Sequence, residues 1–320
     1  MDGAEKHTPS DRIAIIVPCY NEAAVIERFY AELTSALDRL DAVWRVCFID
    51  DGSTDSTVDC LNRLAKLDHR VRVYSLSRNF GHQVALSAGL DVTLGSAVVM
   101  MDADLQHPPS IVPQMIALWR TGHDVVSAVR ADTEGATWFK RATANVFYWL
   151  INRSGETSIV PGAADFCLLS ARAHAAVCAM PERHRFLRGM VSWIGFDRAY
   201  VRFQAPRRPA GESKYTTFKM LGLAIDALFS FSAAPMRIAT RVGFALLVPG
   251  TVYFLYIVAR YLVLDDFVRG WGSLIGTLMI IGGIQLIFIG MVGEYLARIF
   301  EESKRRPLYF FKQTPDDADD

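Results

Sequence analysis

The chain has 320 residues, and its 34 Lys and Arg are balanced by 34 Asp and Glu, which gives a formal net charge of zero. This balance gives no reason to expect nucleic acid as a partner, and the length allows a catalytic domain plus an appendage. The five cysteines include no C-x-x-C pair, so the sequence suggests neither a disulfide framework nor a zinc site. The polar N-terminus lacks the apolar run of a signal peptide, so we expect the catalytic part to stay in the cytoplasm.

Short apolar runs alternate with helical patterns over the first hundred residues. We expect strands at four such runs, residues 12–18, 44–49, 71–76 and 97–101. This order predicts βαβ units and an α/β fold with a mostly parallel sheet, which binds ligands beyond the carboxyl ends of its strands. Polar segments follow three of these ends, at residues 18–22, 50–53 and 102–106. The sequence contains neither G-x-G-x-x-G nor G-x-x-x-x-G-K-[ST], which argues against a glycine loop that cradles phosphates.

From Val242 the composition becomes that of a membrane segment. Residues 242–264 and 273–297 are each long enough to cross about 30 Å of hydrocarbon at about 1.5 Å per residue. Arginines precede the first segment and basic residues follow the second, whereas the turn between them is acidic. The positive-inside rule therefore predicts a two-helix transmembrane hairpin in the cytoplasmic membrane, with both termini cytoplasmic. The alternative is a pair of buried core helices in a soluble protein.

These patterns predict a cytoplasmic catalytic domain over residues 1–236, the hairpin over 237–300 and a cytoplasmic tail over 301–320. Within the first part, residues 138–152 combine basic and aromatic side chains, and the apolar stretch 215–235 is interrupted by charges. Helices of this kind can lie among lipid headgroups, although core-facing helices are the alternative. Glycines in the second membrane segment suit close helix packing and would allow a homo-oligomer.

Asp102 and Asp104 follow the fourth strand, in the sequence VVMMDADLQHPP. In an extended segment the side chains of residues i and i+2 leave the same face, so both carboxylates can bind one divalent cation. Mg²⁺ or Mn²⁺ would then be shared with substrate phosphates, and the cation would offset the repulsion between the two acids. Turn or helix-cap aspartates are the alternative, but the position at the end of an apolar strand favours the metal site.

Asp50 and Asp51 follow the second strand in the same way. Their carboxylates could accept hydrogen bonds from a ribose or a base, and Tyr20 could stack on that base. Helix capping by Asp51, Ser53 or Asp55 is the alternative.

Six motifs together resemble a known family: PCYNE, DDGSTDST, SRNFGHQVALSAGL, MDADLQHPP, ADFCLLS and GESKY, in that order. They resemble the inverting nucleotide-sugar glycosyltransferases of the dolichyl-phosphate mannose synthase type. The likeness is greatest to bacterial polyprenyl-phosphate glycosyltransferases with two C-terminal membrane helices, the bactoprenol glucosyltransferase group. It covers nearly the whole chain and implies the nucleotide-sugar-binding fold called GT-A. The sequence also has no Q-x-x-R-W motif, which favours transfer of a single sugar.

The resemblance also implies roles for individual residues. Nine would contact the nucleotide sugar: Pro18, Tyr20, Asn21, Glu22, Asp50, Asp51, Asp102, Asp104 and Gln106. Asp104 and Asp102 would hold the metal, and Asp165 would be the acidic residue on the acceptor side. Arg130 would lie near the donor diphosphate or the acceptor phosphate. Arg208 and Lys214 would bind the lipid phosphate. Solvent-exposed or ordinary juxtamembrane charges are the alternative for these three basic residues.

The implied reaction is a metal-dependent transfer of one hexose to a polyprenyl phosphate, with undecaprenyl phosphate as the expected lipid. The acceptor phosphate is already ionised near neutral pH, so Asp165 need only orient the sugar or assist, and in-line attack inverts the anomeric centre. UDP-glucose is the expected donor, with GDP-mannose, UDP-N-acetylglucosamine and a modified arabinose donor as alternatives. A different acceptor, such as a diacylglycerol or a glycan end, and a membrane-tethered nucleotide-sugar-binding scaffold without catalysis also stay open. We expect His82 and His107 to make only capping or hydrogen-bonding contacts, and the arginine-rich segment 182–190 to line the acceptor cleft or to be solvated.

Overall fold

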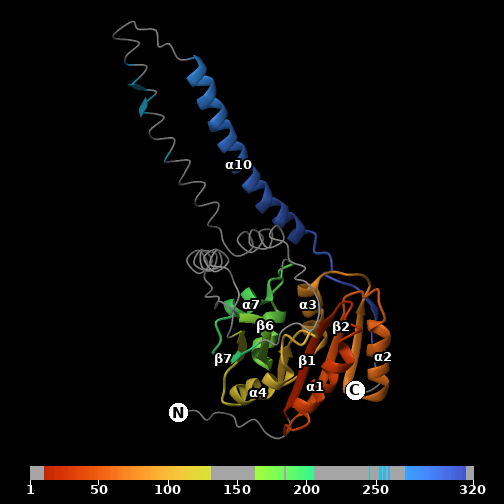
Figure 1. The fold of residues 1–320 in the computed structure, drawn as a ribbon. Helices are drawn as coiled ribbons and strands as arrows, with labels where there is room; N and C mark the ends of the chain where they lie inside the picture. Colours follow the sequence, from red (N-terminus) through yellow and green to blue (C-terminus); the bar gives the residue numbers. More distant parts are fainter. Residues whose placement is uncertain are drawn as a thin grey trace. The chain divides into compact units, whose positions relative to one another are not determined.

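The structure is a computed structural model that describes residues 11–130, 163–183, 185–204 and 271–314, together with residues 245, 252, 253, 255, 256 and 259. Arg208, Lys214 and the predicted interfacial segments 138–152 and 215–235 lie outside the described residues, as does most of the predicted span 242–264. The chain forms two compact units. The first unit contains the described strands, and the second contains the long helix α10 (Figure 1).

Eight strands form one sheet in the order β7-β5-β6-β4-β1-β2-β3-β8. Their bounds are β1 Arg12–Cys19, β2 Val43–Asp50, β3 Val71–Leu76, β4 Ala97–Met100, β5 Val125–Arg130, β6 Ala163–Ser170, β7 Arg198–Phe203 and β8 Phe311–Gln313. Strand β1 is parallel to β2 and β4, β2 is parallel to β3, and β5 is parallel to β7. Only β6 and β8 run the other way. The predicted α/β fold with a mostly parallel sheet is confirmed, and the four predicted strands end within one residue of the observed bounds.

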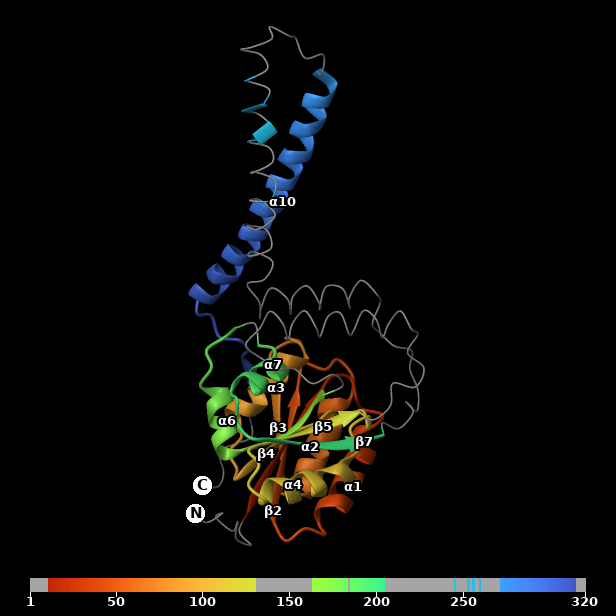
Figure 2. The same ribbon diagram turned by 90° about the vertical axis from the view of Figure 1, so that its left-hand side faces the viewer.

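Helices cover both faces of this sheet (Figure 2). One face packs against α1 (Ile26–Leu37), α2 (Thr57–Leu67), the short 3₁₀ helix η1 (Pro109–Ile111) and α4 (Val112–Arg120), and the other against α3 (His82–Val92), α6 (Ala171–Cys178) and α7 (Leu187–Trp193). Successive strand residues point to opposite faces, so Ile13 and Ile15 join the first core while Ala14 and Ile16 join the second. Burial on both faces explains why these strands are continuous apolar runs.

The residues after the long helix return to the sheet as strand β8, which the sequence pattern did not predict. Phe311 pairs with Leu76 at the edge of β3, and the Ser77 N–H donates to the Phe310 carbonyl at 2.8 Å. The Tyr309 hydroxyl donates to Asp91 Oδ2 at 3.0 Å, and the ring of Tyr309 packs against the second core. The tail therefore covers the β3 edge and belongs to the first compact unit.

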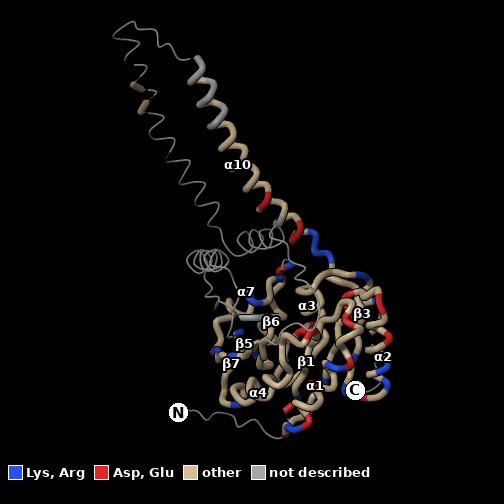
Figure 3. The backbone as a smooth tube through the Cα atoms, in the orientation of Figure 1, with Lys and Arg blue, Asp and Glu red and all other residues tan. Residues whose placement is uncertain are grey.

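The second compact unit contains α10 (Trp271–Ser303), which includes the predicted span 273–297. Within it, Ile281–Ser303 is long and apolar enough to cross a membrane, and it is the one such helix among the described residues. In Figure 3 the part of α10 that is coloured by residue type is mostly uncharged, and charged residues lie toward its C-terminal end. At about 1.5 Å per residue, 33 residues span about 50 Å, which exceeds the thickness of a bilayer core.

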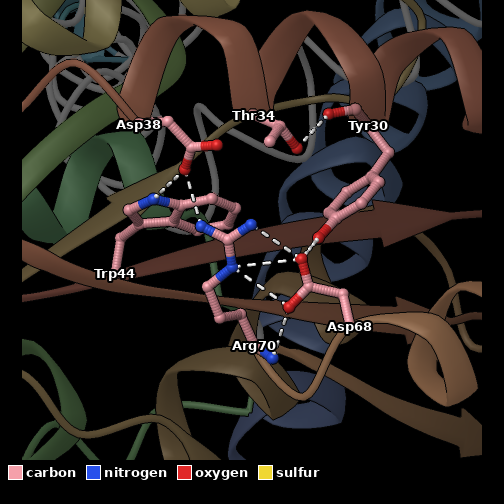
Figure 4. Close-up of polar contacts among 6 residues, drawn as sticks. All are labelled: Tyr30, Thr34, Asp38, Trp44, Asp68 and Arg70. Carbon is pink, nitrogen blue, oxygen red and sulfur yellow. Dashed lines mark hydrogen bonds and ion pairs between the residues drawn. The ribbon is translucent and has the colours of Figure 1, made fainter.

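An ionic network lies at the amino-terminal edge of the sheet, where β2 and β3 begin (Figure 4). Its members are Tyr30, Thr34, Asp38, Trp44, Asp68 and Arg70. Arg70 donates to Asp68 Oδ2 at 2.7 Å and to Asp38 Oδ1 at 2.6 Å, and its guanidinium lies 3.9 Å from the Trp44 ring centroid. These bonds hold the pKa of Asp68 well below its ordinary value, while burial and the contact with Asp68 raise the pKa of Tyr30 to about 12. The network joins α1 to the strand starts, at the opposite edge from the predicted site.

Candidate functional site

The predicted site residues of β1 and β2 meet because the two strands are in parallel register. Cys19 pairs with Asp50, so the segments that follow them emerge together at the carboxyl edge. The Asn21 N–H donates to Ser53 Oγ at 2.9 Å, and the Thr54 N–H donates back to Asn21 Oδ1 at 2.9 Å. The positive φ of Asn21, 56°, is a conformation that asparagine adopts more readily than most residues. The two loops that the sequence assigned to the nucleotide are thus one hydrogen-bonded unit.

Pro18, Tyr20 and Glu22, the other predicted site residues at the end of β1, differ in their contacts and exposure. Pro18 lies within β1, next to its end. The Glu22 N–H donates to Thr57 Oγ1 at 2.9 Å at the start of α2. Tyr20 is 44% exposed, which leaves much of its ring accessible to a ligand. The Tyr20 ring, which directly follows β1, is therefore largely open to solvent.

Asp51 holds a third loop in place. Its Oδ1 accepts the Phe80 N–H at 2.7 Å and its Oδ2 accepts the Gly81 N–H at 2.9 Å. Burial raises the pKa of Asp51 above its ordinary value, and the two amide donors oppose that shift. Gly52 is required beside it because its φ is +69° and an added Cβ would lie 2.5 Å from the Arg78 carbonyl carbon. Asp51 therefore fastens the loop between β3 and α3 to the end of β2.

Asp50 and Asp55 make local contacts in the same region. Asp50 is 2% exposed, and its Oδ1 accepts the Ser53 N–H at 3.1 Å. Asp55 Oδ1 accepts the Thr57 N–H at 3.0 Å at the start of α2. Of the three residues that could have capped this helix, Asp55 is the one whose side chain bonds to its first turn.

The predicted metal motif, Asp102 and Asp104, lies on a bent loop. Strand β4 ends at Met100, so the extended segment expected for Asp102 and Asp104 does not continue through the pair. The Asp102 N–H donates to His107 Nδ1 at 3.0 Å, and the Gln106 N–H donates to Asp104 Oδ1 at 3.0 Å. Between them, Leu105 has a φ of +60°, a left-handed conformation that costs roughly 1–2 kcal/mol for a residue with a side chain. These bonds maintain the bend against that strain.

His107 supports this loop from the core side. It is 7% exposed and stacks on Phe166 with ring centroids 4.9 Å apart. Burial lowers its pKa, and Nδ1 accepts an N–H, so the ring is neutral. The expected hydrogen bond of His107 is confirmed.

Strand β6 brings Asp165 to the same edge because β6 runs antiparallel to β4. Met100, the last residue of β4, pairs with Cys167, so the loop that follows β4 and Asp165, two residues before Cys167, lie at the same edge of the sheet. His82 lies between the two carboxylates, with its Nε2 3.4 Å from Asp102 Oδ1 and 3.9 Å from Asp165 Oδ2. The metal motif and the predicted acceptor-side acid are therefore neighbours.

Two further side chains bond to Asp165. Gln83 Nε2 donates to Asp165 Oδ2 at 3.1 Å, and Arg188 Nε approaches Asp165 Oδ1 at 3.4 Å. The Asp165 side chain is 17% exposed, and that of Arg188 is 29% exposed. Sequence reasoning did not single out Gln83, and it left the segment around Arg188 undecided between an acceptor cleft and a solvated loop. The sequence feature that could have indicated Gln83 is its position at the start of α3, directly after the loop that bonds to Asp51.

Arg130 lies apart from the carboxylates of Asp102, Asp104 and Asp165 in its contacts. It is exposed at the end of β5, and among the described residues no hydrogen bond or ion pair links it to Asp102, Asp104 or Asp165.

The donor set at this edge fits a divalent cation shared with a ligand. Asp102 and Asp104 offer carboxylate oxygens, and the side chain of Asp102 is 32% exposed. In the described part of the chain, no group of three or more His, Cys, Asp or Glu converges on one point. A cation here would take further ligands from water and phosphate oxygens, which is how Mg²⁺ is usually bound.

Comparison with known proteins identifies the family of this chain. Residues 14–176 match the family described as Glycosyl transferase family 2, and residues 234–299 match the GtrB C-terminal hairpin. The uncharacterized glycosyltransferase YkcC of Bacillus subtilis is 38% identical over 94% of this chain and 93% of its own length. The prophage bactoprenol glucosyl transferase homolog of Escherichia coli is 36% identical, over 94% and 99%. The bactoprenol glucosyl transferase of Shigella phage SfV is 37% identical, over 94% and 98%. The protein thus belongs to glycosyl transferase family 2, and its C-terminal region matches the GtrB hairpin.

Proposed function

We propose that the protein transfers a single glucose from UDP-glucose to undecaprenyl phosphate at the cytoplasmic face of the membrane. The observation that carries this proposal is the meeting of the Asp102 loop and Asp165 at one edge of the sheet, with His82 Nε2 3.4 Å from Asp102 Oδ1 and 3.9 Å from Asp165 Oδ2, beside the hydrogen-bonded loops that follow β1 and β2. Relatives named bactoprenol glucosyl transferase, similar over nearly their whole length, support the sugar and the lipid.

In this proposal the donor lies along the carboxyl edge. Tyr20 stacks on the base, and Pro18, Asn21 and Glu22 form the wall next to it. Asp50 contacts the ribose or the base, while Asp51 acts through the loop that it holds. Asp104 and Asp102 bind Mg²⁺ or Mn²⁺, with Gln106 beside the diphosphate. A cation held by these two residues would neutralise the charge that develops on the leaving diphosphate.

The acceptor phosphate is the nucleophile. Its oxygen is ionised near neutral pH, so no strong general base is needed, and Asp165 orients the sugar or the acceptor. In-line attack at the anomeric carbon gives an inverted, β-linked product from an α-linked donor. Arg130, Arg208 and Lys214 are proposed to bind donor or acceptor phosphates through charge-assisted hydrogen bonds.

We also propose that two helices span the membrane over residues 242–264 and 273–297, with both termini cytoplasmic. The match to the GtrB hairpin, the apolar length of α10 and the basic residues that flank the two segments support this arrangement. Residues 138–152 and 215–235 are proposed to lie at the headgroup level, and the glycines of the second span leave room for a homo-oligomer.

The proposal is tested with purified full-length protein in detergent. The assay supplies undecaprenyl phosphate, a divalent cation and one donor at a time, and it measures nucleotide release and the mass of the lipid product. We expect glucosyl-phosphoundecaprenol from UDP-glucose, and little product from GDP-mannose, UDP-N-acetylglucosamine or a modified arabinose donor. A product with another sugar, or transfer to diacylglycerol instead, would correct the donor or the acceptor. Donor binding without turnover under any condition would favour the scaffold alternative.

A further inference from the structure

We infer that Gln83 is a positioning residue that fixes the carboxylate of Asp165 for sugar transfer, with Arg188 engaging the second carboxylate oxygen. This inference rests on the proposed function of Asp165 and adds two residues from two different helices to the site.

The orientation of the Gln83 amide is determined by the backbone of α7. The Leu187 N–H lies 3.0 Å from Gln83 Oε1, and a backbone N–H can only donate, so the oxygen of the amide must face it. The amide nitrogen then faces Asp165 Oδ2 at 3.1 Å. Gln83 therefore presents a donor to Asp165, and a flipped amide would lose both bonds.

Gln83 is itself held firmly. It lies in the first turn of α3, directly after the loop whose Phe80 and Gly81 amides bond to Asp51. A continuous set of bonds thus runs from the end of β2, through this loop and the start of α3, to Asp165.

Arg188 completes the arrangement from α7. It follows Leu187 directly, and its Nε lies 3.4 Å from Asp165 Oδ1. Donors on both oxygens restrict rotation of the carboxylate, and each oxygen retains a lone pair for a substrate hydroxyl. A carboxylate held this way suits an orienting role, because small displacements of a positioned group can reduce a rate by roughly 100-fold.

A purely structural role for Gln83, in which it only joins α7 to α3, makes a different prediction. Glutamate at this position keeps an acceptor for the Leu187 N–H but turns a carboxylate oxygen toward Asp165. Gln83→Glu therefore preserves the contact between the helices and removes the positioning bond. Gln83→Met removes both bonds without adding a charge. Ser87→Ala is the matched control, because it removes the bond of the Ser87 hydroxyl to a backbone carbonyl of α3, at 2.8 Å, and leaves the Gln83 side-chain amide and Asp165 in place.

The experiment measures kcat, KM and donor affinity of the full-length protein with UDP-glucose and undecaprenyl phosphate. We expect kcat of Gln83→Glu and Gln83→Met to fall roughly 10- to 100-fold. Donor affinity should stay within about threefold, which also shows that the variants are folded, and Ser87→Ala should behave like wild type. In an Asp165→Asn background, Gln83→Glu should have little further effect, because the residue it acts through is already lost.

Three results would overturn the inference while leaving glucosyl transfer itself intact. They are an unchanged kcat in Gln83→Glu, a full additional loss in the Asp165→Asn background, or wild-type transfer by Asp165→Asn. Failure of the wild-type protein to transfer any sugar would instead overturn the proposed function, and this inference with it.

Discussion

Replacing Asp51 with asparagine should loosen the loop between β3 and α3. The carboxylate accepts two N–H groups, from Phe80 and Gly81, and hydrogen bonds to a charged group contribute about 1.5–3 kcal/mol each. Asparagine can accept one of these N–H groups but turns its own NH₂ toward the other. The variant also avoids burying a charge, which offsets part of the loss. We expect a net cost of about 1–3 kcal/mol.

This change is measured by hydrogen exchange of peptides that contain Phe80 and Gly81. Because about 1.4 kcal/mol corresponds to a factor of ten, exchange should accelerate roughly 5- to 100-fold in Asp51→Asn. UDP-glucose affinity should fall along with it, since in the proposed site Asp51 acts on the donor through this loop. Asp59→Asn is the control, because Asp59 is exposed in the first turn of α2 and should change stability by less than about 1 kcal/mol. Unchanged exchange at Phe80 and Gly81 in Asp51→Asn would refute the reasoning.

Three further predictions concern stability. Asp68→Asn should destabilise the first unit by about 1–3 kcal/mol at neutral pH, because it weakens the bonds to Arg70. Folding lowers the pKa of Asp68, so its charge stabilises the fold at pH values above the pKa of the unfolded chain, about 4. In urea unfolding, the difference in free energy between wild type and variant should therefore shrink as the pH falls below about 4. The pKa of Tyr30 is raised to about 12, so its neutral hydroxyl stabilises the fold below about pH 10, and this stability is lost as the pH rises toward 12. A wild-type unfolding free energy that stays constant between about pH 10 and 12 would contradict the contact with Asp68. Tyr309→Ala should cost about 1–3 kcal/mol, because its ring packs on the second core and its hydroxyl bonds to Asp91, and equal protease sensitivity of this variant and wild type would argue against a docked tail.

The sequence predicts those parts of the site that depend on neighbouring parallel strands. The runs around Ile15, Phe48 and Val99 are apolar because both faces of the sheet are covered, and this makes their strand ends easy to locate. Because β2 and β4 both run parallel to β1, Asp50 and Asp102 then lie at the same carboxyl edge of the sheet. The bend after Met100 is less accessible to such reasoning, because it depends on His107 reaching back to the Asp102 amide.

The remaining features depend on pairings between distant parts of the chain. Asp165 was expected only through the family resemblance, because nothing local indicates that β6 runs antiparallel into the sheet. Gln83 and Leu187 meet across 104 residues, through the docking of two helices whose apolar patterns do not specify a partner. Strand β8 has three residues and pairs with a strand more than 200 positions earlier, so its short sequence carries too weak a pattern to identify it.

The most direct test of the account compares wild type with Asp104→Asn in glucosyl transfer from UDP-glucose to undecaprenyl phosphate, with and without a chelator. If the carboxyl-edge loop holds a cation against the donor diphosphate, wild-type transfer should require added Mg²⁺ or Mn²⁺. The variant should lose at least about 100-fold in rate, while the thermal stability of the protein changes little. Transfer that persists in the chelator, or that proceeds at the wild-type rate in Asp104→Asn, would contradict it.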